Sequence, residues 1–379
     1  MIIGNVHKKS VNILGLMTGS SADGLDLCLV NFSGDGRSPD YEVLYSHEIT
    51  YPHQFQTSFR NPLELNDKDI SMLDDELGAW FASEIKKLHL SFDFIASHGQ
   101  TIKHEPPHFS LQIGNPKYMS ETFNCSVIYD FRTADIEMGG QGAPLIPIVD
   151  QFLFQQESLD VLALNIGGIA NLTMVPGVNN SNPLLAWDTG PGNTLIDRAV
   201  RLFTQDKLAY DQGGHLAAQG KLNLKLLDSL LEHEFYQRTP PRSAGQEQFG
   251  KLYFQNILKQ FYPGNEQEFK DLIHTTTLLT AKTIARSVNS LSSEYSANSM
   301  QVGGGGVLNK TLMDMLVKDL PRLDIYKTNL NGVTQANKEA FGFAYLGYLF
   351  VNDFTANLPS VTGAQKAVTL GKLFDPKTI

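Results

Sequence analysis

Hydrophobic and polar residues follow two alternating patterns along this chain of 379 residues. Short apolar runs bounded by Gly, Asp, Asn or Ser are typical of buried strands, and longer segments with apolar residues at helical spacing separate them. Strands that alternate with helices indicate an α/β fold. In the first part of the chain we predict strands at 11–17, 25–32, 41–50, 92–96 and 125–129, and a helix at 67–90.

The opening pattern of strand, glycine turn and strand occurs a second time, about 150 residues later. The run 160–166 is followed by Gly167-Gly168 and then by the run 169–176. This spacing is one domain length, and 379 residues exceed what one hydrophobic core usually serves, so we predict two domains. Beyond the second copy we predict helices at 193–203, 222–232, 271–292, 309–317 and 339–350, and a strand at 298–302.

Composition and charge narrow the classes of partner. Forty acidic against thirty basic residues give a net charge of −10, which repels a polyanion, so we expect no nucleic acid partner. No run approaches the roughly 18 apolar residues of a membrane helix, so we expect no membrane partner. Two cysteines cannot form a disulfide framework, and this favours a reducing compartment, the cytoplasm. The sequence does not decide between a monomer and a homodimer.

The N-terminus has two interpretations. Lys8-Lys9 followed by VNILGLM and small residues has the order of a secretory signal. The apolar run is only seven residues long, contains Asn12, and is followed at once by a second apolar run. We therefore favour a strand that begins a β-hairpin.

Three glycine-containing turns are candidate nucleotide contacts. Glycine permits a tight turn and lets backbone N–H groups face a phosphate, while hydroxyls and carboxylates can hold Mg²⁺ through water. A plain hairpin, or a flexible loop, is the alternative for each. The first turn lacks the lysine of a Walker loop. The candidates are Gly19, Ser20, Ser21, Ala22, Asp23, Gly24, Leu25 and Asp26; Gly167 and Gly168; and Gly303, Gly304 and Gly305 with Asn309.

Asp188 is the candidate catalytic base. It lies in WDTGPGN, which we interpret as a strand end and a glycine-rich turn into a helix. Phosphoryl transfer asks the protein for little more than such a base, Mg²⁺ and positioning. The alternative is that Asp188 caps the helix, although Asn193 or Thr194 can also supply that cap.

A histidine pair and an arginine are further candidates. His98 and His104 flank a polar segment, and lining of a sugar pocket or loop hydrogen bonding is favoured over a metal pair, since no acidic or cysteine cluster completes a zinc set. Arg132 can pair with Asp135, or it can bind a substrate carboxylate in a bidentate manner. The sequence leaves these two readings of Arg132 open.

Ten sequence blocks in order resemble the anhydro-N-acetylmuramic acid kinase family, from about residue 13 to 371. WDTGPGNTLID and GGQGAPLIP are the most specific. The others are GLMTGSSADGLD, SHGQTIKHEP, LQIGNP, DFRTADIEM, LNIGGIANLT, YDQGG, GGGGVLNKTL, KEAFGFAYL and NLPSVTGA, of which DFRTADIEM continues directly into GGQGAPLIP.

The resemblance implies two ribonuclease-H-like domains of the actin, Hsp70 and sugar kinase type, with an interdomain cleft for ATP and Mg²⁺. In that fold the C-terminal stretch returns to the first domain, so we predict one domain from 1–130 plus 345–379 and another from 131–344. The implied reaction uses ATP and water to convert 1,6-anhydro-N-acetylmuramic acid, an amino sugar of the cell wall, into N-acetylmuramic acid 6-phosphate. Two rivals keep the fold: a nucleotide-dependent scaffold or chaperone, and a phosphatase.

The resemblance also implies residue roles. Asp188 would activate the water, and the turn of residues 19–26 would hold phosphates, with Asp23 or Asp26 reaching Mg²⁺ through water. The turn of Gly167-Gly168 would face the phosphates, and Gly303, Gly304 and Gly305 with Asn309 would border the adenosine. Glu339 would lie near the sugar, and Arg132 would bind its lactyl carboxylate; His98 remains a substrate-binding candidate from its own sequence context.

The chain departs from the family at two blocks. The usual GTSMDG has Ser20 and Ala22 in place of threonine and methionine. The usual PPKSTGRE reads PPRSAGQE here, with Arg242, Ala244 and Gln246. Neither change removes the base or the glycines, so we expect phosphoryl transfer to be intact. Sugar specificity is the property that we expect these changes to affect.

Overall fold

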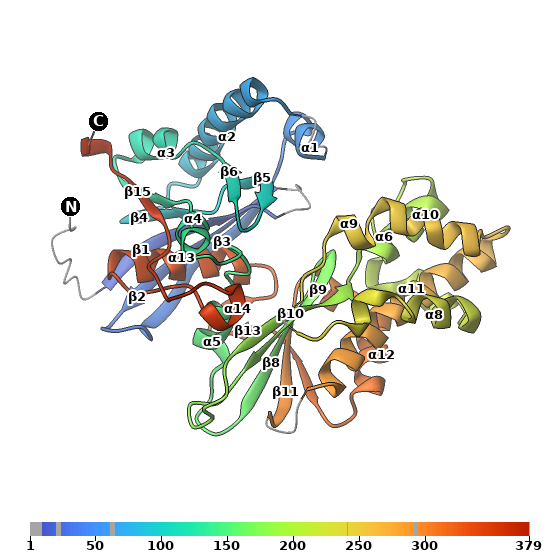
Figure 1. The fold of residues 1–379 in the computed structure, drawn as a ribbon. Helices are drawn as coiled ribbons and strands as arrows, with labels where there is room; N and C mark the ends of the chain where they lie inside the picture. The colour runs from blue at the N-terminus through green and yellow to red at the C-terminus, as the bar shows by residue number, and fades with distance from the viewer. Residues whose placement is uncertain (1–9, 20–23, 61–64, 241, 292–294, 379) are drawn as a thin grey trace. The chain divides into compact units, whose positions relative to one another are not determined.

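The computed structural model describes residues 10–19, 24–60, 65–240, 242–291 and 295–378. The chain divides into two compact units, each built on its own sheet (Figure 1). Unit 1 comprises Met1–Phe152, Asn329–Val333 and Asn337–Ile379, and unit 2 comprises Leu153–Thr328 and Thr334–Ala336. Unit 1 is larger than the first domain predicted from the sequence, because residues 131–152 and 337–344 also pack with it. The predicted domain limits remain a prediction.

The sheet of unit 1 has the order β15-β7-β4-β1-β2-β3. Its first three strands pair antiparallel, and β4 and β7 extend it in parallel. The bounds are β1 Ser10–Met17, β2 Gly24–Ser33, β3 Asp40–Thr50, β4 Phe94–Ser97, β7 Ser126–Tyr129 and β15 Lys372–Phe374.

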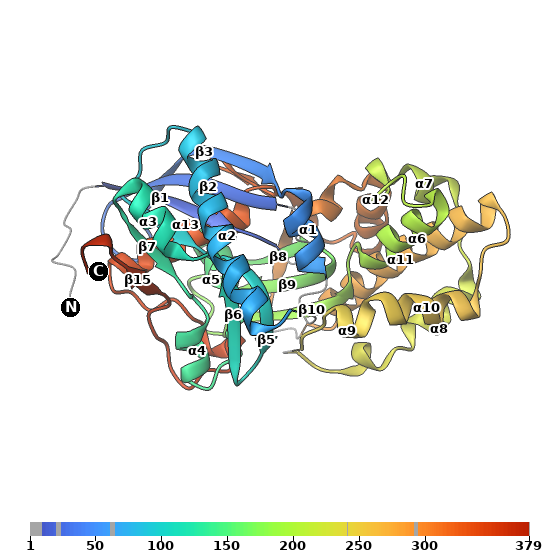
Figure 2. The same cartoon turned by 90° about the horizontal axis from the view of Figure 1, so that it is seen from above.

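Side chains that alternate along β1 serve both faces of this sheet. Leu14 and Leu16 join the core formed with α2 (Asp67–Lys87). Gly15 points to the other face, where a β-carbon would overlap the carbonyl oxygen of Ala340 in α13 (Lys338–Val351). The glycine thus allows the nearly buried helix α13 to lie directly on the strand (Figure 2).

The sheet of unit 2 repeats this arrangement with the order β10-β9-β8-β11-β12. Its first three strands are again antiparallel, and β11 and β12 are added in parallel. Both units therefore have the ribonuclease-H-like order, and the predicted duplication is confirmed. The bounds are β8 Asp160–Ile166, β9 Ile169–Val175, β10 Leu185–Pro191, β11 Ala297–Gly303 and β12 Asp324–Lys327. Helices α6 Thr194–Thr204, α8 Leu224–Leu231, α11 Glu266–Asn289 and α12 Lys310–Asp319 belong to this unit.

The α/β class and the predicted strands and helices are confirmed, with shifted ends. The run 11–17 is a strand, β1, as favoured over a signal. Helix α11 begins at Glu266 and ends at Asn289, because Asn265 caps it with its side chain, so the predicted range 271–292 was displaced. The sequence analysis missed the hairpin of β5 (Gln100–Glu105) and β6 (Phe109–Ile113), whose polar strands lack an apolar run.

The described helices and the two cysteines bear on the class of protein. None of the helices there is long and apolar enough to cross a membrane. Cys28 is buried in β2 and Cys125 is half-buried just before β7, and both are free thiols. Burial raises the pKa of each to about 12, so neither is a reactive thiolate.

Candidate active site

Asp188 lies within a strand, which corrects the prediction that it ends one. Strand β10 continues to Pro191, and its pairing with β9 shifts register between Asp188 and Gly190. Gly190 has φ +142°, and a β-carbon there would lie 2.8 Å from the ring of Tyr236. The TGPG sequence therefore places a β-bulge directly after the carboxylate, a device that re-aims side chains near active sites.

The Asp188 carboxylate is held by a loop rather than by a helix. The backbone N–H of Ala244 donates to its Oδ2 at 2.7 Å, and the N–H of Asp188 donates to the carbonyl of Arg242 at 2.9 Å. Helix α6 begins at Thr194 with Asn193 in the N-cap position, so Asp188 does not cap it. The helix-cap alternative for Asp188 was therefore wrong.

Burial decides the protonation of this carboxylate. It raises the pKa of Asp188 to about 6, while the Ala244 N–H and the Arg242 charge oppose the rise and the Glu247 charge adds to it. A group with a pKa near 6 is ionised at neutral pH and still accepts a proton readily. Asp188 thus has the properties of a general base.

The turn of Gly167-Gly168 joins β8 to β9 beside the start of α6. The carbonyl of Gly168 accepts from the N–H of Gly192 at 2.9 Å, and that of Gly167 accepts from Asn193 at 2.8 Å. A β-carbon at Gly168 would meet nothing closer than Gln246 Nε2 at 3.7 Å. A β-carbon would make only an ordinary contact at this position, so packing does not require glycine here.

The glycine run after β11 has two different members. Gly304 has φ +78°, and a β-carbon there would lie 2.7 Å from Asn165 Oδ1, so the backbone requires glycine. At Gly305 the nearest atom to a β-carbon is Asn193 Nδ2 at 3.9 Å. Gly304 thus shapes the turn, and Gly305 leaves space for a ligand.

A pocket of about 210 Å³ opens beside Gly305 in unit 2. Tyr210 and Leu308 line it with 58% and 59% of their surface exposed, which offers apolar area to a flat base. Asn309 also lines it, but its Oδ1 accepts from the Leu312 N–H at 3.0 Å and caps α12. The complete lining is Asn193, Ile196, Asp197, Tyr210, Asp211, Gly213, Gly305, Leu308 and Asn309.

The sequence analysis assigned no role to most of this lining. Gly213 and Gly214, in the block YDQGG, have φ +65° and +75°. A β-carbon at Gly214 would overlap Asn309 Oδ1, so the pair brings residues 210–214 against the start of α12. Two adjacent glycines in a polar segment were the signal available in the sequence.

His98, Arg132 and Glu339 come together in unit 1. His98 follows β4, Arg132 precedes α4 (Thr133–Glu137), and Glu339 lies in the first turn of α13. Arg132 Nη2 lies 2.9 Å from His98 Nε2, and Nη1 donates to the carbonyl of Gly142 at 2.8 Å. Burial lowers the pKa of Arg132 to about 10, and the Glu339 charge opposes this shift.

These contacts assign the protonation states of the cluster. Burial and the Arg132 charge lower the pKa of His98 well below its usual range, so the imidazole is neutral and accepts at Nε2. Burial raises the pKa of Glu339, which Lys338 and Arg132 partly offset. The cluster is a partly buried set of polar groups in which the guanidinium of Arg132 can pair with a carboxylate.

The contacts of Asp135 decide between the two interpretations of Arg132 as an ion-pair partner. Asp135 accepts from the N–H of Gly142 and from the side chains of Asn357 and Thr362, and it forms no salt bridge with Arg132 in the described chain. The reading of Arg132 as the partner of Asp135 was therefore wrong. His98 Nε2 is occupied by Arg132, and no group of three or more His, Cys, Asp or Glu within the described residues is able to hold a metal ion.

Part of the first turn lies next to this cluster. Thr18 Oγ1 donates to the carbonyl of Gly99 at 2.7 Å, and Gln100 Nε2 donates to that of Gly19 at 3.3 Å. Gly24, Leu25 and Asp26 begin β2. Ser20, Ser21, Ala22 and Asp23 lie outside the described residues.

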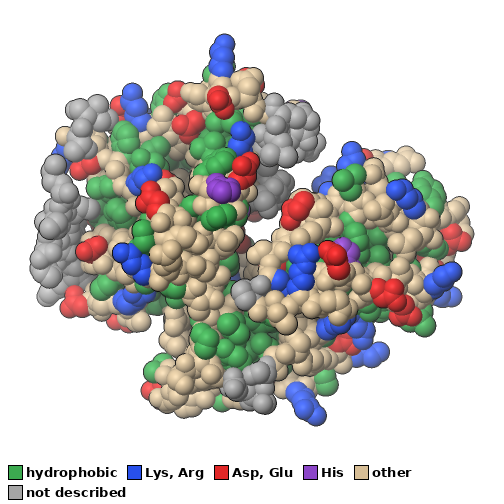
Figure 3. All heavy atoms as spheres, viewed as in Figure 1, with side chains coloured by type: hydrophobic (Ala, Val, Ile, Leu, Met, Phe, Trp, Pro, Cys, Tyr) green, Lys and Arg blue, Asp and Glu red, His purple; other side chains and the backbone are tan. Residues whose placement is uncertain are grey.

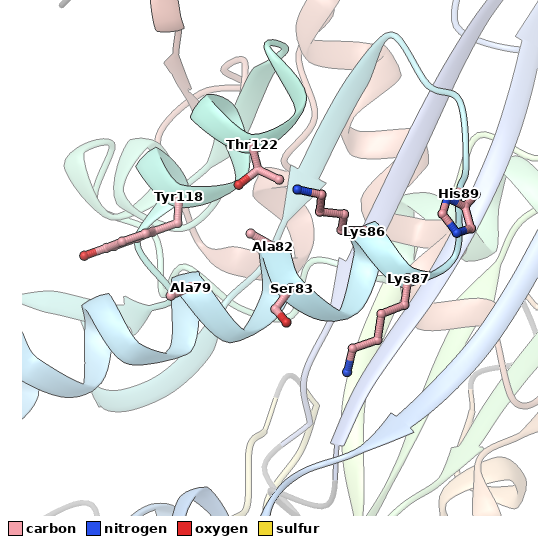
Figure 4. Close-up of a pocket in the computed structure, with 8 residues that line it drawn as sticks. All are labelled: Ala79, Ala82, Ser83, Lys86, Lys87, His89, Tyr118 and Thr122. Atoms are coloured by element: carbon pink, nitrogen blue, oxygen red, sulfur yellow. The ribbon is translucent and has the colours of Figure 1, made fainter.

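Another pocket lies on unit 1 between α2 and α3 (Pro116–Phe123) (Figure 4). Lys86, Lys87 and His89 line it together with small and hydroxyl side chains, but no carboxylate does. None of the predicted site residues lies there. The buried carboxylate of Asp188, in contrast, lies in β10 and not in this pocket.

The surface carries charged side chains of both signs. On the face shown in Figure 3, basic and acidic side chains are interspersed over both units. Nucleic-acid-binding proteins gather basic residues into a stripe or patch. No such stripe is seen on this face.

Comparison with known proteins gives one answer over the whole chain. Residues 11–376 match the family model described as anhydro-N-acetylmuramic acid kinase. A protein of that name from Caldanaerobacter subterraneus subsp. tengcongensis is 36% identical over 97% of this chain and 98% of its own length. Another from Bacillus cereus is 34% identical over 96% of this chain and 99% of its own.

Proposed function

The chain belongs to the anhydro-N-acetylmuramic acid kinase family, and we infer that it uses ATP and water to convert 1,6-anhydro-N-acetylmuramic acid into N-acetylmuramic acid 6-phosphate. It is a phosphotransferase of amino sugar metabolism and peptidoglycan recycling. The observation that supports the assignment of its base is the buried Asp188 carboxylate, held at one oxygen by the Ala244 N–H and with its pKa raised to about 6.

The substrate sets an unusual chemical requirement. Its O6 is bonded to C1, so no free 6-hydroxyl exists to be phosphorylated. In the proposed step a water oxygen bonds to C1 and the C1–O6 bond breaks, while O6 bonds to the γ-phosphorus and the bond to ADP breaks. Asp188 takes the proton that the water loses, so it acts on water where an ordinary sugar kinase base acts on a hydroxyl.

The other candidate residues have binding roles in this proposal. In unit 2 the pocket at Gly305 and Asn309 takes the adenosine, with Gly303 and Gly304 beside it, and the turn of Gly167 and Gly168 faces the phosphates. In unit 1, Arg132 pairs with the lactyl carboxylate, and His98 and Glu339 hydrogen-bond the sugar. Gly19, Gly24, Leu25 and Asp26 are assigned to the phosphates in this proposal, and the same role for Ser20, Ser21, Ala22 and Asp23 stays a prediction.

The residues present fit a Mg²⁺ ion that is held largely by the nucleotide and by water. Within the described chain no cluster of three ligands is available, and Mg²⁺ in kinases is commonly held by one or two carboxylates, water and the nucleotide phosphates. Asp26, or Asp23 outside the described residues, supplies such a carboxylate. The ion neutralises phosphate charge when it is bound.

A cytoplasmic location agrees with the use of ATP and with two free cysteines. A homodimer stays a prediction, and light scattering after size-exclusion chromatography measures it.

The assay uses ATP, Mg²⁺ and 1,6-anhydro-N-acetylmuramic acid in H₂¹⁸O. The expected product is a sugar 6-phosphate with ¹⁸O at C1 and none in the phosphate. Asp188→Asn is expected to lower kcat by about 10²–10⁴-fold. A product labelled in the phosphate indicates a phosphatase, and ATP use without a sugar phosphate indicates a scaffold or chaperone. A wild-type rate in Asp188→Asn contradicts the role of the base.

A further inference from the structure

Arg242 contacts the candidate base through its backbone and its side chain. The Asp188 N–H donates to the carbonyl of Arg242 at 2.9 Å, and Arg242 Nε donates to the carbonyl of Asp188 at 3.1 Å. Two residues further along, the Ala244 N–H donates to Asp188 Oδ2 at 2.7 Å. The position of one residue, Arg242, therefore fixes both the backbone and the carboxylate of Asp188.

The rest of the guanidinium is anchored to unit 2. Nη2 donates to Ser287 Oγ in α11 at 2.9 Å, and Nη1 donates to the carbonyl of Arg238 at 2.6 Å. The guanidinium carbon lies 4.9 Å from the ring centre of buried Phe235. The planar guanidinium of arginine can donate in these three directions at once, whereas the ammonium group of lysine is a single point of charge.

We propose that Arg242 is a positioning residue of Asp188: it fixes residues 242–244 against β10, so that Oδ2 is held by Ala244 and Oδ1 is left to accept the proton. This proposal rests on Asp188 being the base. Hydrogen bonds among the described residues reach only Oδ2 of this carboxylate. The contact from residue 244 uses the backbone, so the departure from threonine to Ala244 does not remove it.

The electrostatic surroundings separate positioning from simple support of the fold. The charged groups that face Asp188 are Arg242, which lowers its pKa, and Glu247, which raises it. Burial lowers the pKa of Arg242 itself, the Arg286 charge adds to this shift, and Tyr236 and Asp188 oppose it. Removing the charge of residue 242 thus raises the pKa of Asp188, whereas Arg242→Lys keeps the charge and loses the planar set of donors.

The test compares the pH dependence of kcat and the KM values in three variants. Arg242→Gln is expected to lower kcat about 10–100-fold with little change in either KM, and to move the acid limb of the rate to higher pH. Arg242→Lys is expected to lower kcat while the acid limb stays in place. The matched control is Arg238→Gln, whose exposed side chain pairs with Glu234, and its kinetics are expected to equal those of the wild type.

A fourth variant keeps the test decisive when Arg242→Gln folds poorly. Ser287→Ala removes only the anchor of Nη2, and it is expected to lower kcat several-fold with an unchanged acid limb and melting temperature near that of the wild type. A wild-type kcat and acid limb in folded Arg242→Gln, or a wild-type kcat in both Arg242→Lys and Ser287→Ala, overturns the proposal. A wild-type rate in Asp188→Asn overturns instead the role of the base, so the two failures are distinguishable.

Discussion

The raised pKa of Asp188 predicts that its ionised carboxylate destabilises the folded protein at neutral pH. Its pKa is about 6 in the folded chain against an ordinary value of 3.8. A raised folded pKa contributes stability that is fully present below pH 3.8 and is lost as the pH rises through 6. Since a pKa difference of one is worth about 1.4 kcal/mol, the loss at pH 8 is about 3 kcal/mol.

Asp188→Asn replaces the charged group by a neutral one that still accepts from the Ala244 N–H. We expect this variant to be more stable than the wild type at pH 8, by up to about 3 kcal/mol. For a unit of this size that is roughly 6–12 °C in melting temperature. The advantage should shrink as the pH falls through 6 and disappear near pH 4. Differential scanning calorimetry from pH 4 to 8 measures it, alongside the kcat that the same variant loses.

Asp160→Asn is the matched control in the same unit. Asp160 is buried and accepts from the N–H groups of Gly177 and Ser296 and from Asn180. These donors lower its pKa, although burial opposes them. Its charge therefore stabilises the fold above the ordinary pKa of 3.8, and Asp160→Asn should lower the melting temperature at pH 8. Equal and pH-independent shifts in the two variants would refute the reasoning.

Three further predictions test the pocket at Gly305 and two sets of buried polar contacts in unit 1. Gly305→Ala should keep the wild-type melting temperature and weaken ATP binding, measured by calorimetric titration, whereas Gly304→Ala should also destabilise the fold; unchanged affinity in Gly305→Ala would contradict the adenosine assignment. In the wild type, Lys338 Nζ lies 2.8 Å from Asp150 Oδ1, and both side chains are 5% exposed. Lys338→Met removes one charge of this buried pair and should lower the free energy of unfolding by about 3–5 kcal/mol, measured by thermal unfolding. A double change that removes both charges should cost less. Asp135→Asn places an amide against three donors and should lower stability by about 3 kcal/mol, and a wild-type melting curve would show that these bonds contribute nothing.

Local sequence patterns were enough to predict the strands, the duplication and the candidate base of this protein. Apolar runs such as 11–17 and 160–166 become β1 and β8 because a strand buried on both faces needs a continuous apolar sequence. Their spacing revealed the duplication, since each unit must build its own core. Asp188 was predicted to be the base because a carboxylate beside a glycine-rich turn into a helix is well placed to accept a proton. Motif resemblance, rather than periodicity, supplied the reaction and its substrate.

Tertiary structure decided what depends on residues far apart in the chain. Arg242 is 54 positions from Asp188, and no local pattern indicates that it reaches the carbonyl of that residue. The choice between the partners of Arg132 also depended on packing, because Asp135 is occupied by Asn357 and Thr362 from the C-terminal part of the chain. The pocket at Gly305 joins residues 193–197, 210–213 and 305–309. Periodicity reports which face of an element is buried, whereas the energies of these sites come from contacts that only the folded chain makes.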